Sequence, residues 1–354
     1  MKIVYIAFSR LPTEKAHGLQ IMKTCEALAN RGTEVDLVVP IRRNHIPDDP
    51  FEYYGVEKNL KLTRVPTADL VDWGSVGFVF SVMLFSERAR FTSNFWSADF
   101  IYSRDALVLF QYILLGRRMV YEAHKVPTRL ARFVAKRVER VVVISEALKT
   151  VYQNAGVRPE CIVVAPDGVD VEKFSVPIST ETARATLRLM VQGPIAVYTG
   201  HLYERKGVYT LAAAAEESGV ETYFVGGTPE DVRTFRAAWG TVKNIHIIGH
   251  RPPTEIPLWL KAASVLVIPN SGKDQDSSTY TSPMKLAEYL ASGTPIIASR
   301  VPALEEGLGG SATFVDPDSA SALGAALKRE HKPPTKKPYS WDERANVILS
   351  ALTS

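Results

Sequence analysis

The chain has 354 residues, of which 46% are hydrophobic and 23% are charged, and its formal net charge is +4. This composition is typical of a globular chain of about two domains, and 22 Gly and 22 Pro residues exclude the collagen-like and low-complexity classes. The two cysteines, Cys25 and Cys161, cannot build a disulfide framework, and no apolar run reaches the ~18 residues of a membrane span. We therefore expect a cytoplasmic protein.

Short β-branched runs alternate with helical patterns along the chain, which is typical of βαβ units and a parallel sheet. The first series predicts strands at 2–8, 34–40, 61–66, 99–103, 119–123, 140–145 and 161–166, and helices near 18–32, 105–115, 127–138 and 145–154. The pattern restarts with strands at 194–200, 221–227, 244–249, 264–270, 295–299 and 312–316, and with helices from 206 and near 229–239, 255–262 and 283–291.

The turn-rich segment 165–177 separates the two series and is the expected hinge. The sequence thus predicts an α/β protein with two doubly wound, Rossmann-like parallel-sheet domains, 1–173 and 174–337, that face a cleft. Segment 338–354 is expected to form a terminal helix with one apolar face, made by Trp341, Ala345, Ile348 and Leu349. Ligands of such sheets bind outside the carboxyl ends of the strands, so polar residues just after each strand are the candidates.

In the first domain, Gly18 opens a helix after the first strand and would let an anionic group approach free N–H groups. The G-x-G-x-x-G fingerprint is missing, which disfavours a dinucleotide site. His124 follows strand 119–123 at the edge where a ligand is expected, although a lone histidine is often structural. Arg104, after strand 99–103, and His17 are further candidates for ligand contacts at this edge.

In the second domain, Arg205 and Lys206 follow the first strand and suit a diphosphate, because Arg can bind two oxygens and Lys supplies a point charge. Pro283 fits a first helical turn whose N–H groups can bind phosphate. Glu288 on the same helix can accept from both hydroxyls of a ribose. For the basic pair and for Glu288, a solvated surface position is the alternative.

These segments, in this order and spacing, resemble the retaining glycosyltransferases of the GT-B fold, family 4, the glycogen-synthase-like group. The matching segments are the Gly18 loop, YEAH (121–124), APDGVD (165–170), TGHLYERKG (199–207), VGG (225–227), GHRPPTEIPLWLKAASVLVIPN (249–270), SPMKLAEYLASGTPII (282–297) and the terminal helix with Trp341.

The resemblance implies a hexosyltransferase that moves a sugar from a nucleotide-sugar donor to a glycan, lipid-linked or small-molecule acceptor, with retention and without a metal or other cofactor. It implies that Lys206 holds the donor diphosphate, that Glu288 binds the ribose, and that His124 lies beside the transferring sugar. Backbone contacts would come from Ser282, Pro283 and Met284, and His250 and Arg251 would border the base. The terminal helix would cross back to the first domain.

Two positions depart from the family pattern. His201 stands where the family usually has an arginine, and Arg205 is the candidate replacement. Tyr280 stands where the first of two glutamates is usual, and Asp276 or Asp274 is a candidate substitute. These departures keep two alternatives open, a degenerate scaffold that binds a nucleotide sugar or glycan, and a nucleotide-sugar epimerase. The D-x-D triplet at 274–276 resembles a metal–nucleotide motif, but such short matches are common by chance.

The basic excess lies in residues 1–173, with 24 basic and 20 acidic residues. We expect Arg129, Arg132, Lys136 and Arg140 on one helical face, and the apolar segment 77–90 precedes them. This combination suggests peripheral contact with an anionic membrane surface at its inner face. A solvated helix face and a buried core helix over 77–85 are the alternatives. No zinc spacing, aromatic RNA-binding strand or basic arm is present, so we expect no nucleic-acid partner.

Overall fold

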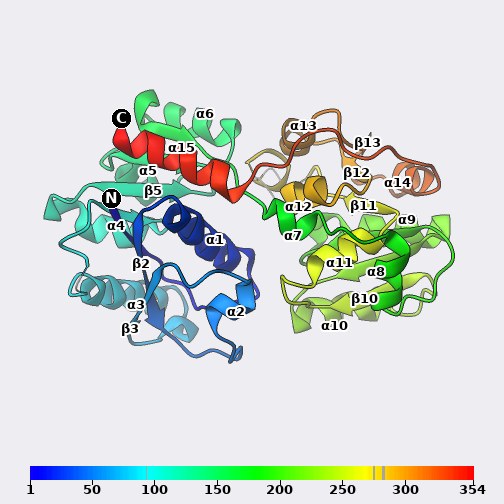
Figure 1. Cartoon of the computed structure of the whole chain (residues 1–354), viewed down its shortest axis with the longest axis horizontal. Helices are drawn as coiled ribbons and strands as arrows, with labels where there is room; N and C mark the ends of the chain where they lie inside the picture. Colours follow the sequence, from blue (N-terminus) through cyan, green and yellow to red (C-terminus); the bar gives the residue numbers. More distant parts are fainter. Residues whose placement is uncertain (93, 274–275, 281–283) are drawn as a thin grey trace. The chain divides into compact units, whose positions relative to one another are not determined.

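The computed structural model describes residues 1–354 except 93, 274–275 and 281–283, and the side chains of 276 and 277 are also outside the description. The chain divides into two compact units (Figure 1). Unit 1 is Met1–Asp167 together with Trp341–Ser354, and unit 2 is Gly168–Ser340. Each unit is built around its own parallel sheet, so the predicted fold class of two doubly wound domains is confirmed.

Unit 1 contains a seven-stranded sheet in the order β3-β2-β1-β4-β5-β6-β7. The strands are β1 (Lys2–Ile6), β2 (Glu34–Ile41), β3 (Lys61–Pro66), β4 (Phe100–Ser103), β5 (Met119–Ala123), β6 (Arg140–Val143) and β7 (Ile162–Val164). All neighbouring strands are parallel. The central strands are almost wholly buried, as expected for a sheet covered on both faces. The strand order reverses between β1 and β4, which is where such sheets bind ligands.

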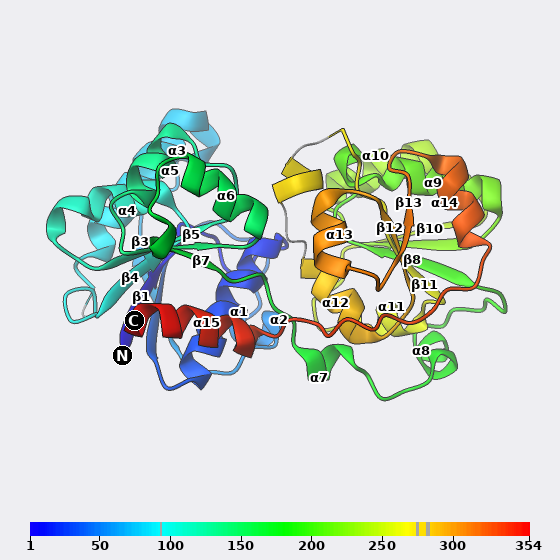
Figure 2. The same cartoon turned by 90° about the horizontal axis from the view of Figure 1, so that it is seen from above.

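The helices of unit 1 cover both faces of this sheet. They are α1 (Ala16–Asn30), α2 (Pro50–Tyr54), α3 (Gly74–Ala89), α4 (Ala106–Tyr112), α5 (Arg129–Ala135), α6 (Glu146–Asn154) and α15 (Trp341–Thr353), with short 3₁₀ turns at Val71–Trp73, Ile113–Leu115 and Pro159–Cys161. Figure 2 shows α1 and α15 on one face, and α3 to α6 on the other. The C-terminal helix α15 packs beside α1, and its buried face includes Arg344 and Leu352, while Leu349 is only half-buried.

Unit 2 contains a six-stranded sheet in the order β10-β9-β8-β11-β12-β13. The strands are β8 (Ile195–Thr199), β9 (Glu221–Val225), β10 (Ile245–Gly249), β11 (Val265–Ile268), β12 (Ile296–Ser299) and β13 (Thr313–Val315). They are again parallel, and their order reverses between β8 and β11. The loops after these two strands therefore flank the expected ligand position of unit 2.

Two apolar layers hold the helices of unit 2 against its sheet. The helices are α7 (Val171–Phe174), α8 (Thr180–Thr186), α9 (Val208–Ser218), α10 (Pro229–Trp239), α11 (Ile256–Ala262), α12 (Met284–Ser292), α13 (Pro302–Leu308) and α14 (Ala320–Leu327), with short turns at Glu204–Lys206 and Asp276–Tyr280. One layer includes Leu260 and Tyr289, and the other includes Leu211 and Phe224. Burial of these side chains drives the two-faced packing.

The predicted basic face over 129–140 is wrong in part. Helix α5 ends at Ala135, and Arg140 begins β6, where its Nε donates to the carbonyl oxygen of Ala351 over 2.7 Å. The β-branched run after Arg140 pairs with both neighbouring strands, and this pairing outweighs helical continuation. In the part of the chain that the structure describes, no helix is long and apolar enough to cross a membrane.

Candidate functional site

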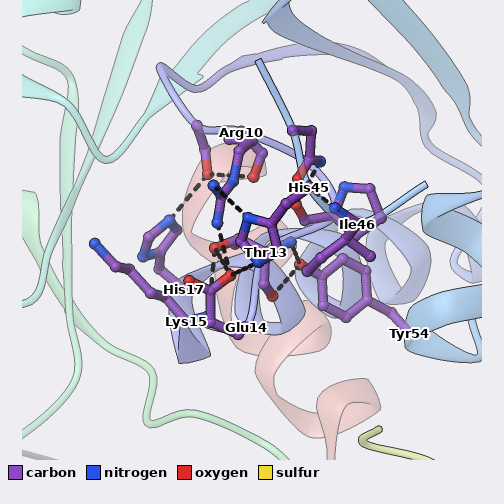
Figure 3. Close-up of polar contacts among 11 residues, drawn as sticks. Arg10, Thr13, Glu14, Lys15, His17, His45, Ile46 and Tyr54 are labelled. Atoms are coloured by element: carbon purple, nitrogen blue, oxygen red, sulfur yellow. Dashed lines mark hydrogen bonds and ion pairs between the residues drawn. The ribbon is translucent and has the colours of Figure 1, made fainter. Parts of the chain in front are cut away.

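The loop between β1 and α1 is held by its own polar contacts (Figure 3). Arg10 forms an ion pair of 2.6 Å with Glu14, and the backbone N–H of Thr13 donates to the Tyr54 hydroxyl over 2.7 Å. A Cβ atom at Gly18 would collide with that hydroxyl. Gly18, predicted to admit an anionic ligand, therefore also admits the Tyr54 ring that anchors the loop.

The loop places His17 at the start of α1, where its Nε2 lies 2.9 Å from the Ser9 hydroxyl (Figure 3). Burial, and after it the nearby charges of Arg104, Lys15 and His124, lower the pKa of His17 to about 4. His17 is therefore neutral at physiological pH. These electrostatic interactions also show that His17, Arg104 and His124, predicted from separate segments, are neighbours in unit 1.

His124 follows β5 directly, and its Nε2 lies 2.6 Å from Oε1 of Glu122. Burial and the Arg104 charge lower the pKa of His124, whereas the Glu122 carboxylate opposes the shift. Burial by itself would raise the pKa of Glu122, but Arg344 and His124 bring it well below its usual range. The site therefore pairs a neutral imidazole with an ionised carboxylate at neutral pH.

Arg104 reaches the same group of residues through Gln20. Its Nη1 donates to Oε1 of Gln20 over 2.7 Å, and the Gln20 amide nitrogen donates to Glu122. The ends of β4 and β5 and the helix α1 thus meet in one polar cluster. Sequence reasoning identified Arg104 and His124 from their positions after strands, but it missed Gln20, Glu122 and Arg344.

In unit 2 the loop after β8 begins with Gly200, at a φ of 128° that favours glycine. The next residue, His201, stacks on Tyr203 with 4.8 Å between ring centroids and lies 3.3 Å from Oδ2 of Asp231. Arg205 and Lys206 follow in a 3₁₀ turn just before α9, and the Arg205 guanidinium lies 5.4 Å from the Tyr203 ring centroid. The loop therefore brings the predicted basic pair to the N-terminus of a helix.

Helix α12 carries Glu288 and, one turn before it, Lys285, which sequence reasoning missed. The Lys285 Nζ atom is buried, finds no hydrogen-bond partner among the described residues, and lies 4.0 Å from the Tyr198 ring centroid. A Cβ at Gly200 would stand 3.0 Å from this Nζ. The available clue in the sequence was the i, i+3 spacing of Lys285 and Glu288, which places both on one helix face.

Burial and the Lys206 charge hold the pKa of Lys285 well below its usual value, while Glu288 opposes the shift. Burial raises the pKa of Glu288 to about 7, against the Lys285 charge. Two lysines and one carboxyl group from the β8 loop and α12 thus influence one another. Such a group can bind an anion, because an anion would relieve the mutual repulsion of the two lysines.

The remaining predicted residues fall in three places. Met284 begins α12, Tyr280 ends the turn that contains Asp276, and Ser282, Pro283 and Asp274 lie outside the described residues. His250 and Arg251 follow β10, which is separated from β8 by β9, and Arg251 pairs with Glu255 at 3.6 Å. Their predicted contact with a base is therefore neither confirmed nor contradicted.

Comparison with known proteins matches two family models. Residues 18–173 match the model described as Glycosyltransferase Family 4, and residues 193–331 match the model described as Glycosyl transferases group 1. A D-inositol 3-phosphate glycosyltransferase of Corynebacterium glutamicum is 26% identical over 51% of the chain. A putative teichuronic acid biosynthesis glycosyltransferase, TuaC of Bacillus subtilis, is 27% identical over 52% of the chain. These matches span 46% and 45% of the two relatives.

Three further matches, to one relative and two solved structures, cover more of the chain. The D-inositol 3-phosphate glycosyltransferase of Nocardia farcinica is 23% identical over 87% of the chain and 76% of its own length. Among solved structures, Anabaena Alr3699/HepE in complex with UDP has a TM-score of 0.69 at 18% identity, covering 99% of this chain and 95% of its own. The sucrose-phosphate synthase of Thermosynechococcus elongatus has a TM-score of 0.73 at 18% identity, covering 99% and 94%. These structures share the fold.

Proposed function

Because the chain belongs to the family-4-like glycosyltransferases of the GT-B fold, we propose that it transfers a hexosyl group from a nucleotide-sugar donor to an acceptor, with retention of configuration and without a metal ion. In this proposal unit 2 binds the donor nucleotide and unit 1 provides His124 to the transferring sugar. The acceptor is a glycan, a lipid-linked sugar or a small molecule.

The observation that carries the proposal is the buried ammonium group of Lys285. A buried charge that has no hydrogen-bond partner among the described residues is costly, and a bound anion would supply that partner. Lys206 acts on the same position electrostatically and lies at the start of α9, whose N-terminal N–H groups favour negative charge. A diphosphate has the charge and the oxygen atoms to bind two lysines and a helix N-terminus together.

Glu288 supports a nucleotide rather than a bare phosphate as the ligand. It lies one turn beyond Lys285 on α12, so a ligand whose phosphates reach Lys285 can bring a ribose to Glu288. The Glu288 carboxylate can accept hydrogen bonds from two neighbouring hydroxyl groups. In the proposed reaction, the acceptor oxygen bonds to the anomeric carbon as the bond from that carbon to the diphosphate breaks. The acceptor proton passes to a phosphate oxygen of the departing nucleoside diphosphate on the same face.

The surface of unit 1 supports a second part of the proposal, peripheral contact with the inner face of an anionic membrane in the cytoplasm. Helix α3 exposes Val76 (83%), Phe80 (55%) and Met83 (48%) at helical spacing. Helix α4 packs beside both α3 and α5, and the Phe110 and Phe133 rings join α4 to α5 at 5.7 Å. The Arg137 guanidinium lies 3.6 Å from the Phe133 ring centroid, and further exposed basic side chains lie on and just after α5: Arg129, Arg132 and Lys136. Apolar side chains beside basic ones suit an anionic lipid surface.

Activity is tested with the purified chain, a panel of nucleotide sugars and acceptors from the three classes. Release of nucleoside diphosphate that depends on an acceptor, with a product of unchanged anomeric configuration by NMR, is the expected result, and EDTA should not change it. Tight donor binding without turnover would instead indicate a binding scaffold. Conversion of the donor without acceptor or new glycoside would indicate an epimerase.

A further inference from the structure

The carboxylate of Glu122 is the centre of a buried polar network in unit 1. Its side chain has no exposed surface. Oε2 accepts a hydrogen bond from the Tyr102 hydroxyl over 2.7 Å, and Oε1 accepts from the Gln20 amide. The same Oε1 lies 2.6 Å from Nε2 of His124 and 2.9 Å from Nη2 of Arg344. The oxygen that faces His124 is therefore also the oxygen that faces the guanidinium group.

Arg344 brings the charge of the C-terminal helix into this network. Its side chain is 1% exposed, and its Nη1 donates to the carbonyl oxygens of Pro166, over 2.9 Å, and Ala165. The Asp167 carboxylate lies 3.7 Å away. Glu122 stays ionised because the Arg344 guanidinium, 2.9 Å from its Oε1, favours the charged form of the buried carboxyl group.

An ionised carboxylate can accept hydrogen bonds but cannot donate them. His124 must therefore present a hydrogen-bearing Nε2 to Glu122, so in the neutral ring Nδ1 keeps the lone pair. Arg104, His17 and the Asp167 carboxylate also act on this imidazole electrostatically, but it is Glu122 that lies within hydrogen-bond distance of Nε2, at 2.6 Å. The orientation of the ring and the position of its proton thus follow from Glu122.

We propose that Glu122 and Arg344 are positioning residues for His124: they fix the plane and protonation of its ring so that Nδ1 accepts a hydrogen bond from a hydroxyl of the transferring sugar. This rests on the proposed function, since only sugar transfer gives Nδ1 that partner. Neither residue touches the sugar in this arrangement. The C-terminal helix then serves the reaction through Arg344 as well as stabilising unit 1.

Two readouts of the Glu122→Gln variant test this. In the wild type, ¹H–¹⁵N NMR of histidine-labelled protein should show a slowly exchanging, low-field Nε2 proton for His124, assigned by its loss in His124→Ala. In Glu122→Gln the hydrogen bond loses its charge, so this proton should move upfield. We expect kcat to fall about 10-fold to 100-fold with the KM for the donor nearly unchanged, because misorientation acts at the reacting centre.

A double-mutant cycle separates positioning from a merely structural role. If Glu122 and Arg344 act through His124, then adding Glu122→Gln or Arg344→Lys to His124→Ala should not lower kcat any further. If Glu122→Gln does not fold because Arg344 loses its partner, Glu122→Gln/Arg344→Gln removes both charges and takes its place. The matched control is Glu26→Gln, which breaks another buried ion pair of unit 1, with Lys23 at 2.7 Å. It should lower the melting temperature and leave the His124 proton unmoved.

The inference would be overturned if the His124 proton kept its chemical shift in Glu122→Gln. It would also be overturned if Glu122→Gln lowered kcat by the same factor in the His124→Ala background as in the wild type. A lower melting temperature with a wild-type kcat would overturn it as well. A wild type that turns over no donor would contradict the proposed function alone, because the NMR signal still decides whether Glu122 and Arg344 hold His124.

Discussion

The Nζ atom of Lys285 lies 4.0 Å from the ring centroid of Tyr198, so a lysine of α12 faces the aromatic ring of β8 instead of solvent. The ring face offers a weak attraction for a cation, but it does not replace hydration. Together with Lys206, this buried ammonium makes the end of β8 a position at which negative charge is favoured.

The first prediction concerns this ammonium. Replacing Lys285 with Met should weaken the binding of nucleoside diphosphates by about 1.5–3 kcal/mol, as for hydrogen bonds to charged groups. The free nucleoside should bind almost unchanged, because it carries no phosphate. The melting temperature should stay the same or rise, since the variant removes a buried charge. Isothermal titration calorimetry and thermal unfolding check both statements.

Lys243→Met, which changes an exposed lysine of unit 2, is the matched control and should leave both ligands unaffected. Lys206→Ala should show the same contrast between diphosphate and nucleoside as Lys285→Met. Equal losses for nucleoside and diphosphate would place the lysines away from the phosphates.

The second prediction follows from the raised pKa of Glu288. Folding raises this pKa from its usual value of 4.5 to about 7, so the folded chain binds an extra proton between these values. The ligand-free protein should therefore lose stability as the pH rises from about 4.5 to 7, by an amount on the order of 2 kcal/mol. Denaturant unfolding at pH 5 and pH 8 should show a smaller loss in Glu288→Gln than in the wild type.

The same residue has a ligand control. Glu288→Ala should weaken binding of a nucleoside diphosphate and leave inorganic pyrophosphate unaffected, because only the former carries a ribose. Equal pH dependence in wild type and Glu288→Gln would show that the carboxyl group is not the source of the effect.

The third prediction concerns His124. His124→Ala should lower kcat by about 100-fold or more, as for the loss of one preorganised polar contact, and leave nucleoside diphosphate affinity nearly unchanged. Steady-state kinetics and calorimetry on the same preparation test this. The melting temperature should be retained, because the imidazole is 15% exposed and does not belong to the apolar core.

His246→Ala is the control for His124, since His246 also pairs with a glutamate, Glu221, but lies at the far edge of the other sheet. It should not change kcat. A wild-type kcat in a stably folded His124→Ala variant would remove His124 from the reaction.

The fourth prediction addresses the exposed face of α3. Val76→Asp combined with Phe80→Glu should reduce sedimentation of the protein with vesicles that contain anionic phospholipid, because both side chains are exposed and would lose favourable transfer from water. Arg129→Gln with Arg132→Gln should weaken binding to vesicles that contain anionic phospholipid and leave binding to vesicles without it unchanged. Met190→Glu, at an exposed apolar side chain of unit 2, is the control. Wild-type protein that stays in the supernatant with anionic vesicles would contradict the membrane contact.

Much of the fold was predictable because it depends on local pattern. The strand run 119–123 and the β-branched run after Arg140 appear as β5 and β6, and the helix after Gly18 appears as α1. Their positions then predicted that His124 and Lys206 follow strand ends. The face of the last helix was predicted less well, since Arg344 is a charged residue and charge alone indicates exposure.

Arg344 shows why the other half of the site could not be predicted. Its spacing from Trp341 and Ile348 places Arg344 on the buried face of α15, but nothing local to the helix shows which groups compensate its charge. Its guanidinium contacts Glu122 and the carbonyl oxygen of Pro166, which is 178 positions earlier in the chain. Lys285 likewise appears in the sequence as an ordinary helical lysine paired with Glu288 one turn on. The ring of Tyr198 on β8 and the loop at Gly200 exclude water from its Nζ.

The sequence by itself determined which segments form strands and helices and which residue types stand at the strand ends. This is possible because each element buries a particular face, and that burial leaves a periodic pattern of apolar residues within the element's own segment. Only the tertiary structure decided which charged groups lose their water and which partners they find instead. The free energy of a charge depends on everything packed around it, and for Glu122 and Lys285 those groups come from segments that are distant in the chain.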